Sequence, residues 1–389
     1  MKASVYWNYA IDFWAEYIHE ISEYKFLPLD DWLKFKFRRM PQIGKRDRLV
    51  YGNILYVAAR FHSSCQSLGD LSSEESLRVS LFLQRKNFEA LQKYLVSDSY
   101  LYDDFRGFLN DFSSYEAKFK IEDDFILSGF PEEYKDYLLE RKLISQWTDE
   151  DTNKFMLMQC LRPPLWVRYQ GRSFLWGESR VPIQKSPHYQ EGFIEVQDFA
   201  SQGIGSKVKA KNGQKVWDSC AGAGGKSLQI SQSMNNTGTI FASDIRSRAL
   251  EELRVRAARA HSDNIMCLPW NGEDLPLDKG SMDWVLADVP CTGSGTWRRN
   301  PDAKIRMFQT QSELQGIQSK LLRLSSLAVK NKGSLVYGTC SFFKWENEDV
   351  VNQFLEENPD FTLQSMEMLG CPYKNSDTMF VAVLKRDKV

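Results

Sequence analysis

"KVWDSCAGAGGKS" (residues 215–227) is the stretch that decides the fold. Its first half is an apolar run suited to a buried strand, and its second half is a glycine-rich turn that leads into a helical stretch. Glycines between a strand and a helix let backbone N–H groups approach a ligand closely, because no Cβ intervenes. The stretch therefore predicts a ligand-binding turn at the carboxyl end of a strand.

Short apolar runs continue to alternate with helical patterns after this stretch. The further predicted strands are TIFASD (239–244), NIMCLP (264–269), MDWVLAD (282–288), GSLVYGT (333–339) and MFVAVLK (379–385), with helical stretches at 248–260, 312–330 and 346–357. This alternation is typical of a mostly parallel sheet with helices on both faces. In such sheets, ligands bind beyond the carboxyl ends of the strands. We therefore expect an α/β, doubly wound, Rossmann-like domain.

The N-terminal part of the chain carries helical patterns instead. Ser72 and Glu75 have the spacing of a capping box before an apolar run, and residues 46–62 repeat apolar side chains at helical spacing. Pro163 and Pro164 then interrupt the helical pattern. The expected organisation is a preceding all-helical domain, a linker with a small α/β subdomain, and the Rossmann-like domain, over residues 1–145, 146–205 and 206–389 respectively.

Composition excludes several classes of protein. No apolar run of the 389 residues approaches the ~20 that a membrane span needs. Acidic residues interrupt the N-terminal stretch, which argues against a signal peptide, so a cytoplasmic protein is expected. The seven cysteines are scattered without a C-x-x-C, and the four histidines show no metal-pair spacing. We expect no disulfide framework, no metal and no membrane association.

Charge is distributed unevenly along the chain. Residues 1–150 contain 20 Lys+Arg against 25 Asp+Glu, whereas residues 151–389 contain 30 against 26. Affinity for nucleic acid depends on local basic patches rather than on the net charge. The basic tilt of the C-terminal part is therefore weak support for an RNA partner.

The spacing of the glycine-rich turn excludes two common nucleotide-binding motifs. A P-loop needs a glycine where Cys220 stands, and a dinucleotide fingerprint that starts at Gly222 needs its final glycine where Ser227 stands. A nucleoside-type cofactor without a pyrophosphate remains. Asp244 ends the next predicted strand and is suited to bind both ribose hydroxyls. S-adenosylmethionine, with an amino-acid end and an adenosine end, suits such a turn with a neighbouring acid.

Two cysteines follow predicted strands in polar turns of small residues. Cys291 lies after MDWVLAD and Cys340 after GSLVYGT, so both are expected at the same sheet edge as the glycine-rich turn. Carbon 5 of cytosine is a poor nucleophile, and a thiolate that adds to carbon 6 makes it reactive toward a methyl sulfonium. Asp288, just before Pro290, is placed to hydrogen-bond the N3/N4 edge of the base. The other cysteines are expected to be small buried hydrophobes.

These motifs together resemble those of the Sun/Fmu-type (RsmB-like) family of RNA cytosine-5 methyltransferases, in its bacterial 16S ribosomal RNA branch. The matching stretches are VQDFASQ (196–202), DSCAGAGGKS (218–227), DVPCTGSGTWRRNPD (288–302) and YGTCSFFKWENE (337–348). The resemblance implies a methyltransferase domain closed by a C-terminal strand pair. It also implies, more weakly, that the helical domain is NusB-like, with GKRDRLVYGNILYVAARF (44–61) as the best stretch.

The resemblance also implies roles for individual residues. Cys340 would be the nucleophile, Cys291 would assist release of the methylated product, and Asp288 would lie between cofactor and base. Asp244 would bind the ribose. The methionine part of S-adenosylmethionine would be held by the turn, which consists of Cys220, Ala221, Gly222, Ala223, Gly224, Gly225 and Lys226.

The sequence departs from the family pattern at three positions. Ala223 stands where proline is usual, and Gln170 stands where asparagine is expected. Asn271 stands where the family often has an acid, and its carbonyl is suited to accept a hydrogen bond from the adenine amino group.

RNA is the expected partner, and three cations near Cys291 are candidates for binding its phosphates: Arg298, Arg299 and Lys304. A solvated surface group is the alternative for these cations, and Trp297 either stacks on a base or packs in the core. The chain is expected to be a monomer that methylates 16S ribosomal RNA. The alternatives are the same chemistry on transfer RNA or another ribosomal site, and a non-catalytic RNA-binding assembly factor.

Overall fold

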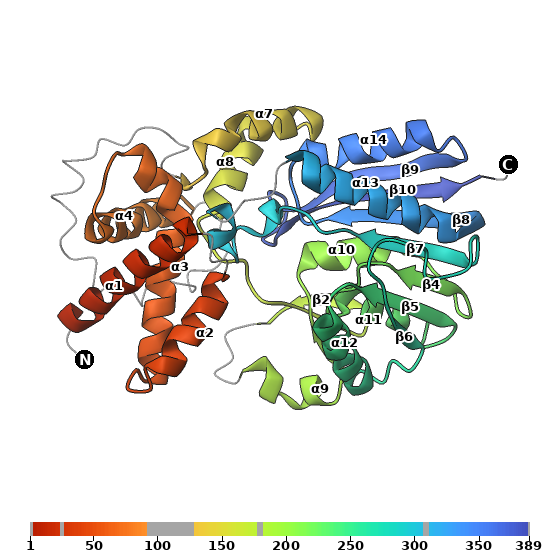
Figure 1. Ribbon diagram of the computed structural model, residues 1–389, viewed down its shortest axis with the longest axis horizontal. Helices are drawn as coiled ribbons and strands as arrows, with labels where there is room; N and C mark the ends of the chain where they lie inside the picture. The colour runs from red at the N-terminus through yellow and green to blue at the C-terminus, as the bar shows by residue number, and fades with distance from the viewer. Residues whose placement is uncertain (1–2, 24–26, 92–127, 177–181, 306–310, 388–389) are drawn as a thin grey trace. The chain divides into compact units, whose positions relative to one another are not determined.

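The computed structural model describes residues 3–23, 27–91, 128–176, 182–305 and 311–387 (Figure 1). The chain forms two compact units. The first contains Met1–Arg162 and Thr296–Phe308, and the second contains Pro163–Gly295 and Gln309–Val389. A short segment after Gly295 thus returns to the first unit before the chain re-enters the second.

The first unit is helical throughout its described residues, as the sequence predicted. Ser72 N–H donates to Glu75 and Glu75 N–H donates to Ser72, which completes the expected capping box. Its core is rich in aromatic side chains that include Phe13, Trp14 and Tyr51. The helices are α1 (Ala3–Ser22), α2 (Leu29–Arg39), α3 (Lys45–Ser67), α4 (Ser73–Leu91), α7 (Lys135–Ile144) and α8 (Asp149–Met158), with 3₁₀ turns η3 (Glu132–Tyr134) and η6 (Pro301–Lys304).

The unit boundary differs from the division expected from the sequence. Helix α8 packs against α4 and belongs to the first unit, which therefore extends to Arg162 rather than to residue 145. Residues 163–205 of the expected linker and small α/β subdomain belong to the second unit, which begins at Pro163.

A small antiparallel sheet opens the second unit, in the order β2-β1-β3. Strand β1 (Trp166–Tyr169) follows Pro163 and Pro164, the two prolines that interrupt the helical pattern. The tight turn to β2 (Arg172–Leu175) places Gln170 at φ +47° and Gly171 at φ +75°. The remaining elements of this region are η4 (Ile183–Lys185), α9 (Pro187–Gln190) and β3 (Ile194–Val196).

The main sheet of the second unit has seven strands in the order β6-β5-β4-β7-β8-β10-β9. Its first five strands in this order are parallel, and β10 runs antiparallel to both β8 and β9. All six strands predicted from the sequence are present, together with β9. The bounds are β4 (Lys215–Asp218), β5 (Thr239–Asp244), β6 (Ile265–Pro269), β7 (Met282–Asp288), β8 (Val329–Thr339), β9 (Phe361–Gly370) and β10 (Thr378–Arg386).

Helices cover both faces of this sheet (Figure 1). One face packs on α13 (Gln311–Ala328) and α14 (Glu348–Glu357) through a core that includes Trp217 and Tyr337. The other face packs on α10 (Phe199–Lys207), α11 (Gly225–Ser233) and α12 (Ser247–Arg259). The unit is therefore doubly wound and Rossmann-like, which confirms the predicted fold class. Short 3₁₀ turns occur at η5 (Ser294–Thr296) and η7 (Lys344–Glu346).

Strand β4 pairs with β5 on one side and β7 on the other, so the strand order reverses between β4 and β7. Ligands of open α/β sheets bind at such a point, beyond the carboxyl ends of the strands. The loops that follow β4, β5, β7 and β8 therefore frame the candidate site.

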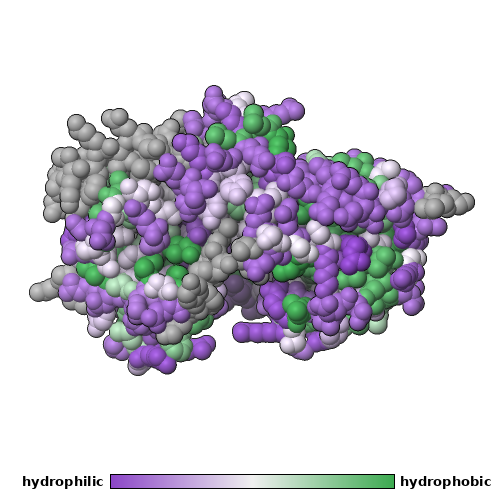
Figure 2. Space-filling view, turned by 45° about the horizontal axis from the view of Figure 1, so that its top comes forward, coloured by the Kyte–Doolittle hydropathy of each residue, from purple (hydrophilic) through white to green (hydrophobic). Residues whose placement is uncertain are grey.

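Hydrophilic side chains cover most of the described surface on the face drawn in Figure 2, with apolar residues in smaller groups between them. Across the described residues, none of the helices combines the length and the apolar character needed to cross a bilayer.

Candidate active site

The glycine-rich turn connects β4 to α11 with a backbone that only glycine adopts easily. Gly222 has φ +55° and Gly224 has φ +82°. A Cβ at Gly224 would also lie 1.9 Å from Cδ1 of Leu253 on α12. Ala221 N–H donates to the Ser243 carbonyl at 2.8 Å, and Gly224 N–H donates to the Ala221 carbonyl at 2.9 Å. The turn is thus packed tightly on one side and held by backbone hydrogen bonds.

Asp244 ends β5 and faces the turn. Its Oδ2 accepts the Gly222 N–H at 2.8 Å, and Arg246 donates both its backbone N–H and its guanidinium to the same carboxylate. Burial alone would raise the pKa of Asp244, but the hydrogen bonds and charge of Arg246 hold it below its ordinary value. Asp244 therefore stays ionised beside the turn.

Lys226, in the first turn of α11, reaches across to Asp288 at the end of β7. Their Nζ and Oδ2 atoms are 2.6 Å apart. Burial would lower the pKa of Lys226, but the charge of Asp288 and the hydrogen bond to it raise the pKa above its ordinary value. Lys226 therefore carries a positive charge, which also interacts with the Cys340 thiol group.

The structure brings Cys291 and Cys340 together. The register of β7 and β8 pairs Asp288 with Gly338, so the loops after both strands start side by side. The two Sγ atoms lie 3.1 Å apart, and Cys340 N–H donates to the Cys291 sulfur at 3.3 Å. Both cysteines are free and partly exposed. Contact with Cys340, and then burial, raise the pKa of Cys291 well above its ordinary value, so Cys291 keeps its proton.

A buried glutamate holds the Cys291 loop in place. Glu346 accepts hydrogen bonds from the Thr292 N–H at 2.8 Å, the Thr292 hydroxyl at 2.6 Å and the Gln318 amide at 2.8 Å. Burial raises the pKa of Glu346 above its ordinary value. The sequence pattern predicted no role for Glu346, which lies in the stretch YGTCSFFKWENE (337–348). The available signal was an acid spaced six residues after Cys340.

Asp218 is a second site residue that sequence reasoning missed. It ends β4, is buried, and accepts the Ser227 hydroxyl at 2.6 Å. Burial raises the pKa of Asp218 to about 7. The Asp218–Ser227 contact joins the two ends of the glycine-rich turn and so helps to fix its shape.

Asn271 lies at the same sheet edge but is exposed. The β5–β6 register pairs Asp244 with Pro269, the last residue of β6, and Asn271 lies two residues further along the chain. Its carbonyl oxygen accepts the backbone N–H of Glu273 at 3.0 Å. The acceptor expected for the adenine amino group is therefore engaged in a local turn.

The structure corrects the prediction that the cations near Cys291 bind RNA phosphates. Arg298 and Lys304 are 0% and 6% exposed, and both lie inside the first unit. Arg298 Nε donates to the Leu161 carbonyl at 3.0 Å, and Lys304 donates to the carbonyls of Arg60 at 3.0 Å and Gly129 at 2.8 Å. Because their donors serve buried backbone, these two side chains do not present a phosphate-binding surface.

Arg299 and Trp297, which lie beside these cations in the sequence, differ in their burial. Arg299 is only half-buried and remains a candidate RNA contact. Trp297 is buried and packs against Phe130 and Tyr134 of the first unit, with ring centroids 5.9 and 5.3 Å away. Of the two roles open to Trp297, the structure shows packing.

No cluster of three or more His, Cys, Asp or Glu side chains suited to hold a metal occurs within the described ranges. The candidate site therefore contains an ion pair, a carboxylate, a glycine-rich turn and two adjacent thiols.

Comparison with known proteins finds a matching family model for the part of the chain that contains these groups. Residues 206–385, which include the turn, Asp244, Asp288 and both thiols, match the family model described as 16S rRNA methyltransferase RsmB/F. Ribosomal RNA small subunit methyltransferase B of Citrobacter koseri is 33% identical over 194 residues, which are 48% of this chain and 44% of that protein. A probable methyltransferase of the same name from Bacillus subtilis is 33% identical over 181 residues, 44% of this chain and 39% of that protein. The chain thus spans less than half the length of these relatives.

Two solved structures share the fold of this chain. The crystal structure of PH0851 superposes with a TM-score of 0.63 at 20% identity and covers 91% of this chain and 93% of its own. A methyltransferase homolog from Pyrococcus horikoshii superposes with a TM-score of 0.55 at 24% identity, over 68% of this chain and 98% of its own. Residues 206–385, somewhat less than half of the chain, are thus similar to the family described as 16S rRNA methyltransferase RsmB/F.

Proposed function

We propose that the second unit methylates carbon 5 of a cytosine in RNA, with S-adenosylmethionine as methyl donor and 16S ribosomal RNA as substrate. The observation that carries this proposal is the 3.1 Å approach of two free thiols, Cys291 and Cys340, beside the Lys226–Asp288 ion pair. A methyltransferase that acts on a nucleophilic atom has no need of a thiol, whereas a carbon that must first be activated needs one.

The residues around the turn fit S-adenosylmethionine. A Cβ at Gly222 would meet only the tip of Arg246, at 3.6 Å, so the space beside this glycine is bounded by a movable side chain. The Arg246 side chain is 68% exposed and is free to turn away from Asp244. The Asp244 carboxylate would then bind the ribose hydroxyls, while the turn from Cys220 to Lys226 would hold the methionine part. When bound, S-adenosylmethionine supplies a methyl group as an electrophile on a sulfonium.

Cys340 is the proposed nucleophile. Its thiolate donates an electron pair to carbon 6 of the cytosine, a sulfur–carbon bond forms, and the electrons of the 5,6 double bond shift toward carbon 5. The positive charge of Lys226 interacts with this thiol group. Asp288, partly exposed at the end of β7, lies where it can hold the N3/N4 edge of the base while charge develops on the ring.

Cys291 is proposed to assist release. Carbon 5 would take the methyl group with its electron pair, and the bond of that methyl group to the sulfonium would break to leave a neutral thioether. The carbon 5 proton then passes to water, the 5,6 double bond re-forms, and the bond from carbon 6 to the Cys340 sulfur breaks. The departing electron pair returns to Cys340 as a thiolate. Cys291, which keeps its own proton and lies 3.1 Å from that sulfur, donates a hydrogen bond to it.

The substrate assignment is supported by the family description and by the relatives, which are named for small-subunit ribosomal RNA. The target base must leave its stack to reach the thiols, which costs on the order of a few kcal/mol. A single-stranded or loop cytosine is therefore the expected target.

The test is methyl transfer from labelled S-adenosylmethionine to total RNA, followed by bisulfite mapping of the labelled molecules. We expect one methylated cytosine in 16S ribosomal RNA that is lost in a deletion strain. Labelled methyl groups in transfer RNA, or at another ribosomal position, would support the proposed chemistry but assign a different substrate. RNA binding without any methyl transfer would instead favour a non-catalytic assembly factor.

A further inference from the structure

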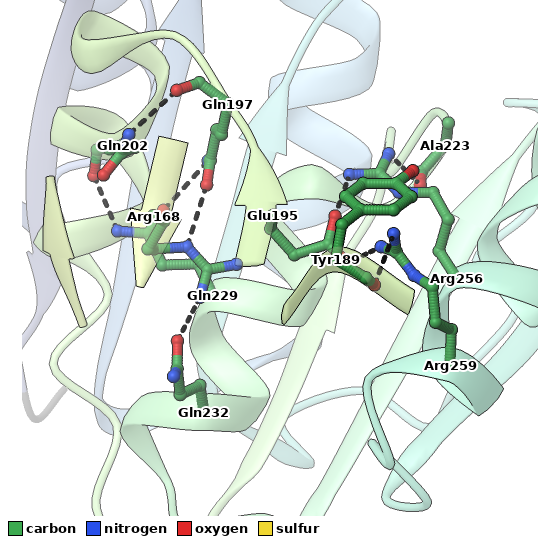
Figure 3. Close-up of polar contacts among 10 residues, drawn as sticks. All are labelled: Arg168, Tyr189, Glu195, Gln197, Gln202, Ala223, Gln229, Gln232, Arg256 and Arg259. Atoms are coloured by element: carbon green, nitrogen blue, oxygen red, sulfur yellow. Dashed lines mark hydrogen bonds and ion pairs between the residues drawn. The ribbon is translucent and has the colours of Figure 1, made fainter. Parts of the chain in front are cut away.

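The small sheet and helix α12 are joined through one buried acid, Glu195 of β3 (Figure 3). Arg256 NH2 lies 2.8 Å from Glu195 Oε2, and Arg259 forms an ion pair with the other oxygen. The Glu195 side chain is only 6% exposed. Such a pair is screened little by solvent, so each guanidinium is held in a defined place.

Arg256 differs from Arg259 in what its guanidinium reaches next. Its NH1 group donates to the carbonyl oxygen of Ala223 at 2.8 Å. Ala223 lies in the glycine-rich turn, between the two glycines with positive φ. Arg256 therefore spans from Glu195 to the backbone of the turn, as Figure 3 shows.

The Ala223 carbonyl controls the orientation of a whole peptide group. In a trans peptide the carbonyl and the following N–H point in opposite directions from one plane. The following N–H, that of Gly224, donates to the Ala221 carbonyl at 2.9 Å and closes the turn. By holding one end of this peptide, Arg256 fixes the other end as well.

A second set of hydrogen bonds connects the small sheet with helix α11. Gln197 donates to Gln229 of α11 at 3.0 Å, and Gln229 donates to the Gln202 carbonyl at 2.8 Å (Figure 3). Arg168 of β1 donates to Gln197 at 3.1 Å. Gln197 and Gln202 belong to the stretch VQDFASQ, which the site itself does not use. The contacts of Glu195 and Arg256 thus connect the small sheet to the turn. The hydrogen bonds of Gln229 connect it to the helix that begins at the end of the turn.

We propose that Arg256 is a positioning residue for the methyl-donor turn, and that Glu195 orients it. The inference rests on the proposed function, because it assigns the turn to S-adenosylmethionine. A turn with three glycines has many conformations available, and ordering it on binding would cost affinity. Arg256 orders the turn in advance, so its contribution falls on donor binding rather than on the chemical step.

Arg259 provides a matched control. It binds the same acid, it also contacts Tyr189, with the guanidinium 3.8 Å from the ring centroid, and it has no contact with the turn among the described residues. Arg256→Gln and Arg259→Gln each remove one cation from Glu195. Only Arg256→Gln also removes the hydrogen bond to Ala223.

The experiment is calorimetric titration of the full chain with S-adenosylmethionine, without RNA, for the wild type and both variants. A hydrogen bond from a charged donor predicts a Kd about tenfold higher for Arg256→Gln. Arg259→Gln should stay within about twofold of the wild type. With saturating donor, Arg256→Gln should retain most of its kcat for methyl transfer. Arg256→Lys keeps the charge but has a single ammonium group in place of the two-pronged guanidinium. Its Kd should therefore lie between those of the wild type and Arg256→Gln.

Equal weakening by both glutamine variants, or no weakening by either, would overturn the role of Arg256 while leaving the proposed function intact. A wild-type chain that bound no S-adenosylmethionine would overturn both. If Arg256→Gln fails to fold, Arg256→Lys decides the matter by the same comparison with Arg259→Lys.

Discussion

The sulfur atoms of Cys291 and Cys340 lie 3.1 Å apart although the residues are 49 positions apart in the chain. The parallel register of β7 and β8 produces this contact, because it sets Asp288 opposite Gly338 and starts both loops at one sheet edge. The Cys340 N–H binds the Cys291 sulfur, and Glu346 holds the neighbouring Thr292. The two thiols thus face each other in unequal surroundings, which suits them to different roles.

Substitution of each thiol should separate those roles. Cys340→Ala removes the proposed nucleophile, so we expect no methyl transfer and no covalent RNA complex. Cys291→Ala leaves the nucleophile but removes the hydrogen bond to the departing thiolate, so an RNA–protein adduct should accumulate. Denaturing gels of each variant after incubation with RNA and S-adenosylmethionine detect the adduct. An adduct with Cys340→Ala, and none with Cys291→Ala, would reverse the assignment.

The Rossmann-like fold and the placement of the thiols could be predicted because their signals are local. Each parallel strand is a short apolar run, and each candidate residue directly follows one. Since the carboxyl ends of parallel strands share an edge, Asp244, Asp288, Cys291 and Cys340 were expected near the glycine-rich turn, and the structure places them there.

The contacts that were missed depend on residues far apart in sequence. Glu195 and Arg256 are 61 positions apart, and no periodicity links them. Lys304 was interpreted as exposed because charged groups usually are. Nothing near it in sequence shows that residues 296–308 return to the helical unit, where Gly129 and Arg60 supply the acceptors.

Removal of the positive charge at Lys226 should slow methyl transfer. Lys226→Met leaves Asp288 without its ion-pair partner and takes a cation away from Cys340. We expect kcat to fall about 10²-fold, the size of effect seen when one electrostatic group is lost from an active site. Rates measured for Lys226→Met and Lys226→Arg test this, and equal losses for the two variants would contradict it.

Alanine at Gly224 should destabilise the second unit more than alanine at Gly213. Both glycines have φ +82°, but a Cβ at Gly213 meets nothing within 4 Å, whereas one at Gly224 would lie 1.9 Å from Leu253. The shared backbone strain costs about 1 kcal/mol. Overpacking against Leu253 should add about 2 kcal/mol. Denaturant unfolding of both variants gives the difference, and similar losses would show that Leu253 moves aside at little cost.

Burial of Lys304 predicts that the first unit becomes more stable as the pH rises above neutrality. Burial lowers the pKa of Lys304 from 10.5 to about 7, so between these values the unfolded chain binds a proton that the folded chain does not. The free energy of unfolding therefore increases with pH across that window, by up to about 1.4 kcal/mol per pH unit. A neutral amine still has two N–H groups for the carbonyls of Arg60 and Gly129. Hydrogen exchange of first-unit amides from pH 7 to 10 measures the slope. Lys304→Met should abolish the slope, whereas Lys45→Met, at an exposed lysine of the same unit, should leave it unchanged. A slope that persists in Lys304→Met would assign it to other groups.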